Sequence, residues 1–473
     1  MSWTTLARLI SKSRPHLVPG KLLVTELWFE VPLDYSRPTG KQIKLFGRTV
    51  SKYERPIIEP SPEDQAKAAQ KPLLVYLQGG PGFGNPQPQD STLSSHMLDR
   101  GYELLLLDYR GTGFSSTVSA ETLKHIGGPQ EQADYLKHFR ADNIVRDCES
   151  VRKYLTKEYP PEKQKWSTFG QSFGGMTTLT YLSLQPDGLR ECFITGGLVA
   201  LDKNAEETYQ STFGKVIERN KIYYEKFPAD VADVKEIAAK IRELGGNEGI
   251  RLPAGGRLTV PLFLTLGINF GKYYGLDIVH NHVVRMKGDI DQFGFFTRAT
   301  LNDIQQAMGW DDAPIYSVLH EPIWCYRPGI ASNWAAERVG KSLENFQWLQ
   351  KDWAGPQSLK DKEPLFFSGE MVYPFFFDTS DELNQLKETA EILAKFDEWP
   401  ALYDEAQLRK NTVPVYAAIY EDMYVFPEDS RKTASIIKGC KTWETSVHFH
   451  GALRSHAADV FRELLRLRDD TIN

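Results

Sequence analysis

One serine in the sequence lies in a pentapeptide that is typical of hydrolase nucleophiles. Residues 170–174 read Gly-Gln-Ser-Phe-Gly, a match to G-x-S-x-G between a strand-like run at 166–170 and a helical stretch beginning near Phe173. In this setting a sharp strand-to-helix turn exposes the serine hydroxyl, and the flanking glycines leave room for it. The start of the helix offers N–H groups to a negatively charged oxygen. We therefore predict that Ser172 is a nucleophile, the alternative being an ordinary glycine-rich turn.

A second glycine-rich segment, Gln78-Gly-Gly-Pro-Gly82, follows the apolar run at 73–77 directly. Acyl transfer needs a backbone N–H opposite the nucleophile, supplied by the loop after an earlier strand, and glycines let that loop approach the substrate carbonyl. A phosphate-binding loop is the alternative, but the spacing G-x-G-x-x-G is absent and Pro81 has no N–H to donate. The segment therefore favours acyl transfer over nucleotide binding.

A serine nucleophile also needs a histidine as its base and an acid that orients the histidine. With this kind of nucleophile turn, the acid follows the serine along the chain and the histidine comes last. Glu421 and Asp422 end a strand-like run at 413–420, which is where the acid is expected. We predict Asp422 as the acid, with Glu421 as its alternative.

Three histidines lie close together after the next strand-like run, at 442–449. His450 is the best placed of them, because it is followed by a glycine at the end of that run, while His448 and His456 remain alternatives. The pair His448-x-His450 is also compatible with part of a metal site, but no third ligand stands at a recognisable spacing. We predict His450 as the base and no bound metal.

The elements that must position these residues follow the pattern of a mostly parallel sheet flanked by helices. Short apolar runs bounded by Gly or Asp are typical of buried parallel strands, and they alternate with stretches of helical periodicity. Two alternating runs joined by a Pro/Gly turn predict an N-terminal β-hairpin. The predicted strands are 24–32, 43–50, 73–77, 104–107, 166–170, 413–420 and 442–449, and the predicted helices include 143–158, a helix from Phe173, and 457–468.

Between these strand-rich segments, residues 204–407 are helical in character and rich in aromatic and charged side chains. A sheet interrupted in this way predicts an inserted, mainly helical domain. We expect a first part of the α/β core at 1–203, the insert at 204–407 and the rest of the core at 408–473. Residues 56–71 are polar and predict a loop.

Composition excludes several classes of function. The 473 residues are 41% hydrophobic and 25% charged, with a net charge of −6, which is typical of a globular protein and not of a nucleic-acid-binding one. No run approaches the roughly 18 apolar residues of a membrane span. Four widely spaced cysteines and the absence of an Asn-x-Ser/Thr sequon favour a cytoplasmic location.

Three motifs together resemble the proline iminopeptidases, which are serine peptidases of the α/β-hydrolase fold. Segments 78–82, 108–115 and 170–175 match the family patterns HGGPG, DQRGTGxS and GxSxGG. The length, the helical insert and the ending from His450 resemble the larger bacterial and fungal branch, and the resemblance covers about residues 24–465. Gln78 and Tyr109 depart from the patterns, at positions that do not perform the chemistry.

The resemblance implies release of N-terminal proline from peptides without a metal or organic cofactor. It implies that the N–H groups of Gly80 and Phe173 form an oxyanion hole, and that Glu321 and Glu370, two acidic residues among aromatic ones, bind the substrate amine. An esterase or amidase with the same triad is the alternative, because a fold does not fix the substrate. A catalytically inactive binding module is a further alternative. The sequence does not predict an oligomeric state.

Overall fold

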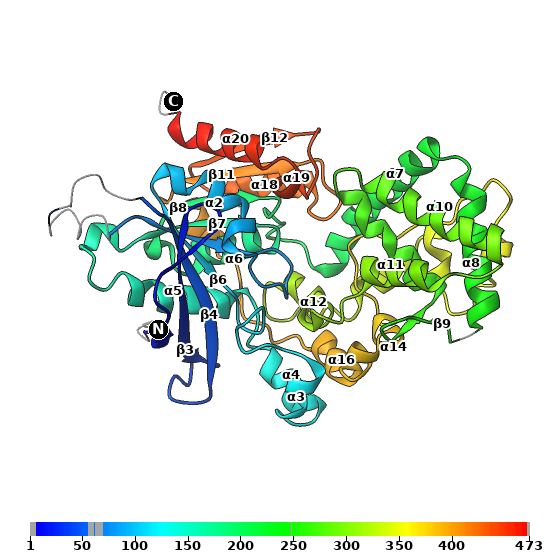
Figure 1. Ribbon diagram of the computed structural model, residues 1–473, viewed down its shortest axis with the longest axis horizontal. Helices are drawn as coiled ribbons and strands as arrows, with labels where there is room; N and C mark the ends of the chain where they lie inside the picture. Colours follow the sequence, from blue (N-terminus) through cyan, green and yellow to red (C-terminus); the bar gives the residue numbers. More distant parts are fainter. Residues whose placement is uncertain (1–5, 55–60, 62–69, 247, 471–473) are drawn as a thin grey trace.

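A computed structural model describes residues 6–54, 61, 70–246 and 248–470 of the chain. Within them, ten strands form one sheet in the order β1-β3-β4-β6-β5-β7-β8-β11-β12, and β2 also pairs with β3 (Figure 1). The strands are β1 (Arg8–Lys12), β2 (His16–Val18), β3 (Leu22–Pro32), β4 (Gln42–Lys52), β5 (Leu73–Leu77), β6 (Glu103–Leu107), β7 (Trp166–Gln171), β8 (Leu189–Thr195), β11 (Val415–Tyr420) and β12 (Cys440–Thr445).

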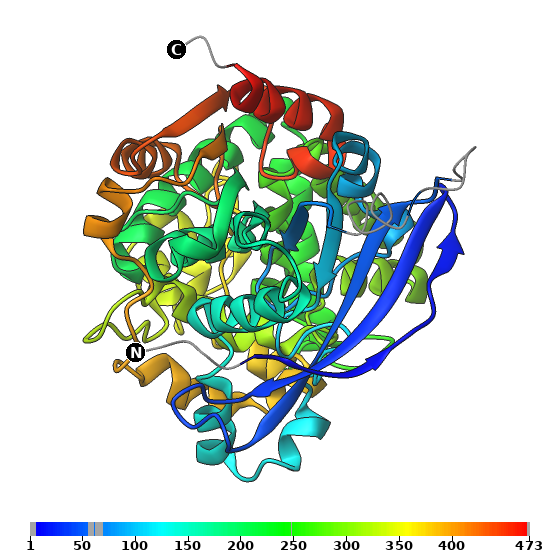
Figure 2. The same ribbon diagram turned by 90° about the vertical axis from the view of Figure 1, so that its left-hand side faces the viewer.

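The sheet is antiparallel at one end and parallel over the rest. Strands β3 and β4 pair antiparallel along their whole length, which confirms the predicted hairpin, and Figure 2 shows them as two long blue strands. From β6 to β12 every neighbouring pair is parallel. All residues of β5, β7 and β11 are buried, which explains why these strands read as continuous apolar or uncharged runs.

Helices cover both faces of the sheet. On one face, side chains of α5 (Ala141–Leu155) and α6 (Phe173–Leu184) share a core with Leu73 and Val75 of β5. On the other face, Leu74 shares a smaller core with α20 (Ala457–Asp469). The alternation of adjacent residues between the two cores follows from the two-residue period of a strand. The predicted α/β class and the three predicted helices are confirmed.

One predicted strand is shorter than expected, and one strand of the sheet was not predicted. The strand predicted for 442–449 ends at Thr445, because the following residues leave the sheet toward His450. The sequence pattern does not predict β8, whose first half contains Arg190 and Glu191. The loop predicted for residues 56–71 lies largely outside the described residues.

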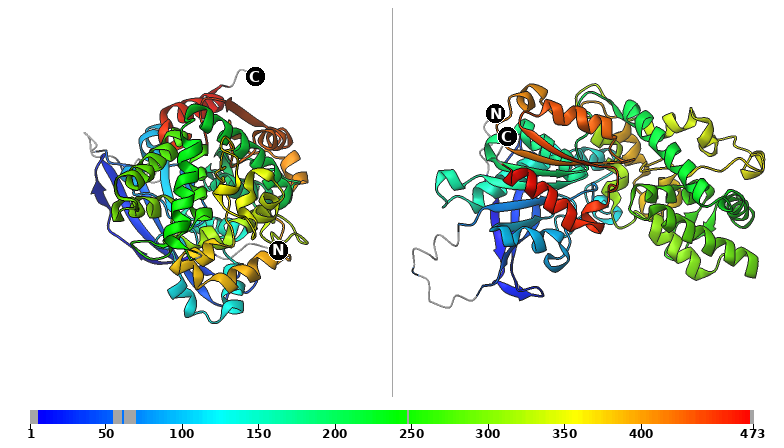
Figure 3. Two further views of the ribbon diagram at one scale, coloured as in Figure 1. Left: turned by 90° about the vertical axis from the view of Figure 1, so that its right-hand side faces the viewer. Right: turned by 90° about the horizontal axis from the view of Figure 1, so that it is seen from above.

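A mainly helical region separates β8 from β11, and we call its residues 204–407 the cap region. Figures 1 and 3 show it lying beside one end of the sheet. Its boundaries as a domain of its own stay a prediction. Its elements include α7 (Ala205–Lys226), α8 (Asp230–Gly245), β9 (Ile250–Arg251), β10 (Arg257–Leu258), α9 (Val260–Leu264), α10 (Gly275–Phe293), α11 (Arg298–Met308), α12 (Pro314–Leu319), α13 (Ala335–Lys341), α14 (Phe376–Thr379), α15 (Asp381–Asn384) and α16 (Lys387–Lys395). In the described part of the chain, no helix combines the length and the apolar character needed to cross a membrane.

Candidate active site

Ser172 occupies a tight turn between β7 and α6. Its φ of 57° and ψ of −121° place it in a backbone region that L-residues rarely adopt. The turn depends on its glycines: a Cβ at Gly170 would lie 2.3 Å from the Gly174 carbonyl oxygen, and one at Gly174 would lie 1.8 Å from the Leu77 carbonyl oxygen. Only glycine therefore permits β7, α6 and the end of β5 to come this close together.

The structure brings Ser172, His450 and Asp422 together in one chain of hydrogen bonds. His450 Nε2 lies 2.7 Å from Ser172 Oγ, and His450 Nδ1 lies 2.5 Å from Asp422 Oδ2. The other oxygen of Asp422 accepts the N–H of Tyr424 at 2.8 Å. The Tyr424 ring packs edge-on against the imidazole, with 4.7 Å between ring centroids. The imidazole is thus fixed on three sides.

The alternative residues for the base and the acid have other contacts. His448 and His456 pack against each other with 4.5 Å between ring centroids, and His448 lies 3.7 Å from Asp459. Glu421 forms an ion pair with Lys215 of α7 at 2.8 Å. In the part of the chain described, none of the three forms a hydrogen bond to Ser172.

The electrostatics around His450 favour a strong base. Burial alone would lower the pKa of the imidazole, but the adjacent Asp422 carboxylate raises it above its ordinary value. Asp422 is itself only 3% exposed. The pair can therefore stabilise an imidazolium when the histidine takes a proton.

The segment Gln78–Gly82 passes directly beside the nucleophile. A Cβ at Gly79 would lie 3.2 Å from Ser172 Cβ. Within the described residues, the N–H groups of Gly80 and Phe173 donate no hydrogen bond to the protein. These are the two groups predicted for the oxyanion hole, and both remain available as donors. The departure Gln78 is accommodated locally, because its side-chain amide donates to the Gly84 carbonyl at 3.2 Å.

Helix α12 brings the cap region onto the core loops. A Cβ at Gly82 would lie 2.8 Å from the Tyr316 nitrogen, and one at Gly111 would lie 2.5 Å from Ile315 Cδ1. The glycines of two predicted motifs therefore also make room for α12. This close approach places Tyr316 beside the segment Gln78–Gly82.

Glu370 lies near enough to His450 and Asp422 for the charges of both to act on its carboxyl group. Its carboxylate accepts the hydroxyl of Tyr316 at 3.2 Å. Burial raises the pKa of Glu370 to about 7, since the opposing influence of His450 is smaller and the Asp422 carboxylate raises it further. A cation placed beside a carboxyl group with this pKa stabilises its ionised form and lowers its pKa.

Glu321 has a different environment. It is 2% exposed, and its two oxygens accept the N–H groups of Ala335 and Ala336 at 3.1 and 2.8 Å. Burial raises the pKa of Glu321 to about 7, against the lowering effect of these two N–H groups. The carboxylate is thus engaged at the first turn of α13.

We expect Glu321→Ala to destabilise the protein by about 1–3 kcal/mol, because two buried N–H groups lose their acceptor. The free energy of unfolding, measured with urea, checks this. Glu337→Ala is a matched control on the same helix, where a half-exposed ion pair to Lys341 is lost, at a cost of at most about 0.5 kcal/mol. Unchanged stability with a raised KM would instead assign Glu321 to the substrate.

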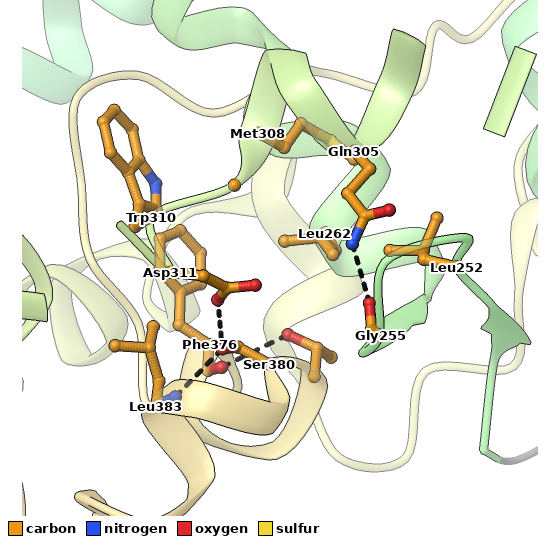
Figure 4. Close-up of a pocket in the computed structure, with 12 residues that line it drawn as sticks. Leu252, Gly255, Leu262, Gln305, Met308, Trp310, Asp311, Phe376, Ser380 and Leu383 are labelled. Atoms are coloured by element: carbon orange, nitrogen blue, oxygen red, sulfur yellow. Dashed lines mark hydrogen bonds between the residues drawn. The ribbon is translucent and has the colours of Figure 1, made fainter. Parts of the chain in front are cut away.

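Aromatic rings pack around Tyr316 where the cap region meets the core loop. Trp310 stacks on Tyr316 with 4.1 Å between ring centroids, and Phe83 of the core loop lies 5.7 Å from Tyr316. Figure 4 shows a separate cavity of about 30 Å³ in the cap region, lined by Trp310 and by Asp311, whose carboxylate contacts Ser380. That volume is far below the several hundred Å³ of a ligand site. The cavity therefore does not replace the site at Ser172.

Sequence reasoning missed Tyr316 and Tyr424. Tyr424 stands two positions after Asp422, so its closeness to the acid is a signal that was available. Tyr316 reaches Glu370 across 54 positions of the cap region. No local spacing predicts that contact.

Comparison with known proteins adds independent evidence. The family model described as "alpha/beta hydrolase fold" matches residues 72–226, which confirms the predicted fold. The chain is 38% identical to the proline iminopeptidase aneH of Aspergillus aculeatus, over 97% of this chain and 96% of that protein. It is 37% identical to the proline iminopeptidase of Aeromonas sobria, over 94% and 96%. A solved proline iminopeptidase from Mycobacterium smegmatis aligns with 14% identity and a TM-score of 0.38, over 93% of this chain and 97% of that one.

Proposed function

Because this chain belongs to the proline iminopeptidase family, we propose that it releases N-terminal proline from peptides. In this proposal Ser172 is the nucleophile, His450 the base and Asp422 the acid that orients it. The observation that carries the proposal is the hydrogen-bond chain of 2.7 and 2.5 Å through these three residues. Such a chain is the geometry of an activated serine.

The reaction proceeds in two steps. Ser172 Oγ attacks the carbonyl carbon of the N-terminal proline while His450 Nε2 takes the hydroxyl proton. The N–H groups of Gly80 and Phe173 stabilise the tetrahedral oxyanion, and His450 then gives its proton to the leaving amine. Water, activated by His450, hydrolyses the resulting prolyl ester, releasing proline and restoring the Ser172 hydroxyl.

Glu370 gives the site its preference for a free amino terminus. The protonated secondary amine of proline carries a positive charge, and a half-buried carboxylate close to the nucleophile is its natural partner. The rings of Tyr316 and its neighbours offer an apolar wall for the pyrrolidine ring. Glu321 supports this arrangement indirectly, through the start of α13.

The decisive experiment compares substrates that share the acyl chemistry and differ in the amine. We expect turnover of proline arylamide to exceed that of other aminoacyl arylamides and of N-acetylated proline arylamide. A simple acyl ester is the control. Turnover of the ester with none of the arylamide would favour an esterase.

We expect Glu370→Gln to lower kcat/KM for proline arylamide by about 10- to 1,000-fold, mainly through KM, because about 1.4–4 kcal/mol of amine binding is lost. Labelling of Ser172 by a small fluorophosphonate, which has no amine, should persist. Glu344→Gln, at an exposed position of the cap region, is the matched control. A normal KM in Glu370→Gln would show that another group holds the amine.

The pKa of Glu370 also predicts a pH dependence. Since this pKa is about 7, the carboxylate loses its charge as the pH falls from 8 to 6, and KM for proline arylamide should rise over that range. The rise in KM should be absent from Glu370→Gln, whereas the decline of kcat at low pH, which reflects protonation of His450, should remain. A KM profile that is the same in both proteins would contradict the assignment.

A further inference from the structure

Two basic residues lie where the cap region meets the loop that carries His450. Lys272 directly follows a short helical segment, Thr265–Gly271, and its Nζ donates to Asn269 Oδ1 at 2.9 Å. Arg454 lies on α19 (Ala452–Ser455), one turn after His450. Both side chains are exposed, and within the described residues neither lies within 4 Å of a carboxylate. In the part of the chain that the structure describes, neither positive charge is therefore neutralised by a salt bridge.

Contacts of the residues on either side of Lys272 place its segment beside the active site. A Cβ at Gly271 would lie 2.5 Å from Tyr424 Cζ, and the Tyr424 ring packs on His450. On the other side of Lys272, the Tyr273 ring lies 4.4 Å from that of His456. The segment around Lys272 therefore lies along the same loop that carries His450 and Arg454.

The charges of these groups act on one another. The surrounding protein partly shields the Lys272 ammonium from water, which lowers its pKa; the charge of Arg454 lowers this pKa further, while Glu370 raises it. Arg454 also opposes the positive charge of the His450 imidazolium. The two positive charges repel each other, Glu370 offsets this repulsion only in part, and a bound anion would relieve it further.

We propose that Lys272 and Arg454 bind the C-terminal carboxylate of the peptide substrate and thereby select short peptides with a free carboxyl group. The inference rests on the proposed function, in which Glu370 holds the opposite, amino end of the same molecule. Arginine and lysine are the usual protein partners of a carboxylate, and arginine can bind it through two parallel hydrogen bonds. The site would thus match both charged ends of a short zwitterionic peptide.

The position of the cations limits the length of the peptide. A peptide chain advances at most about 3.3–3.6 Å per residue. A carboxylate held one helical turn from His450 therefore belongs to a peptide of only a few residues. In a longer peptide, Lys272 and Arg454 would contact uncharged backbone groups in place of the carboxylate. The additional affinity that the carboxylate provides would then be lost.

The test measures binding rather than turnover, in the Ser172→Ala background, so that substrate is not consumed. Calorimetry gives the Kd of Pro-Ala, Pro-Ala-Ala and a six-residue peptide beginning with proline, each as the free acid and as the C-terminal amide. We expect the acid of at least one short peptide to bind about tenfold more tightly than its amide, and the six-residue pair to bind equally. Adding Arg454→Gln or Lys272→Gln should bring the acid-to-amide ratio close to one.

Arg298→Gln, at an exposed position of α11 without an ion pair in the described chain, is the matched control and should keep the ratio. Equal binding of every acid and amide pair, or a ratio that survives both substitutions, would overturn the inference. A failure of the carboxylate site can be distinguished from a failure of the proposed function. Proline arylamide has no carboxylate, so its turnover by the wild-type enzyme tests the proposed function alone.

Discussion

Replacing Ser172 with alanine is expected to lower kcat/KM for proline arylamide by about 10⁴- to 10⁶-fold while leaving the fold intact. The large effect arises because the hydroxyl oxygen forms the covalent bond to the acyl group, and in the described part of the chain His450 Nε2 forms a hydrogen bond to no other hydroxyl or thiol. The fold should persist because the Ser172 backbone already adopts its unusual φ of 57° at a turn fixed by glycines. Alanine keeps the Cβ and removes only the hydroxyl.

Three measurements on Ser172→Ala test this prediction. Steady-state kinetics gives the loss of activity, fluorophosphonate labelling should be abolished, and the thermal midpoint should stay close to that of the wild type. Ser435→Ala, which removes an exposed hydroxyl on α18 (Pro427–Ile436), is the matched control and should change none of the three. Substantial residual turnover in a folded Ser172→Ala protein would remove the basis of the proposed mechanism.

Replacing His450 with alanine should cost as much activity as the change at Ser172, since the members of a triad act as one unit. The imidazole both takes the hydroxyl proton and gives it to the leaving amine, so both steps of the reaction lose their proton carrier. His448→Ala and His456→Ala, which remove neighbouring rings packed against each other, should have much smaller effects. The three histidines lie close together in the chain, but of them only His450 contacts Ser172 Oγ. The comparison therefore separates the effect of this contact from that of removing a nearby imidazole.

The comparison is read from kcat/KM for proline arylamide and from the rate of fluorophosphonate labelling. Both kcat/KM and the labelling rate should fall steeply in His450→Ala, because Ser172 then has no base to take its proton. If His456→Ala proved to be the inactive variant and His450→Ala retained activity, the proposed assignment of the base would be wrong. Glu421→Gln beside Asp422→Asn gives the equivalent test of the acid.

The nucleophile turn and its surroundings could be predicted from the sequence because they depend on short-range contacts. The steric need for Gly170 and Gly174 arises within five positions of the chain and at the end of β5. Strands β5, β6 and β7 could be predicted equally well. They are buried on both faces, so their sequences are short runs without charged residues in the middle. Their boundaries agree with the predicted ones to within one residue.

Other features could not be predicted because tertiary contacts decide them. Strand β8 contains Glu191, a charged residue that a sequence pattern assigns to the surface, yet it is buried and accepts the Tyr102 hydroxyl at 2.6 Å. The two acidic residues of the cap region look alike in sequence, among aromatic neighbours. Only the folded chain separates Glu321, held by backbone N–H groups, from Glu370, held by Tyr316.

The order of the segments along the chain has a consequence for biosynthesis. Ser172 precedes the cap region, whereas Asp422 and His450 follow it, and β11 joins the sheet by pairing with β8. A nascent chain that has passed Ser172 and the whole cap region therefore still lacks the base and the acid of the proposed mechanism. Because β11 and β12 follow the cap region along the chain, peptidase activity can begin only after both strands have been synthesised and have joined the sheet. The unfinished chain is thereby kept from cleaving other peptides while it folds.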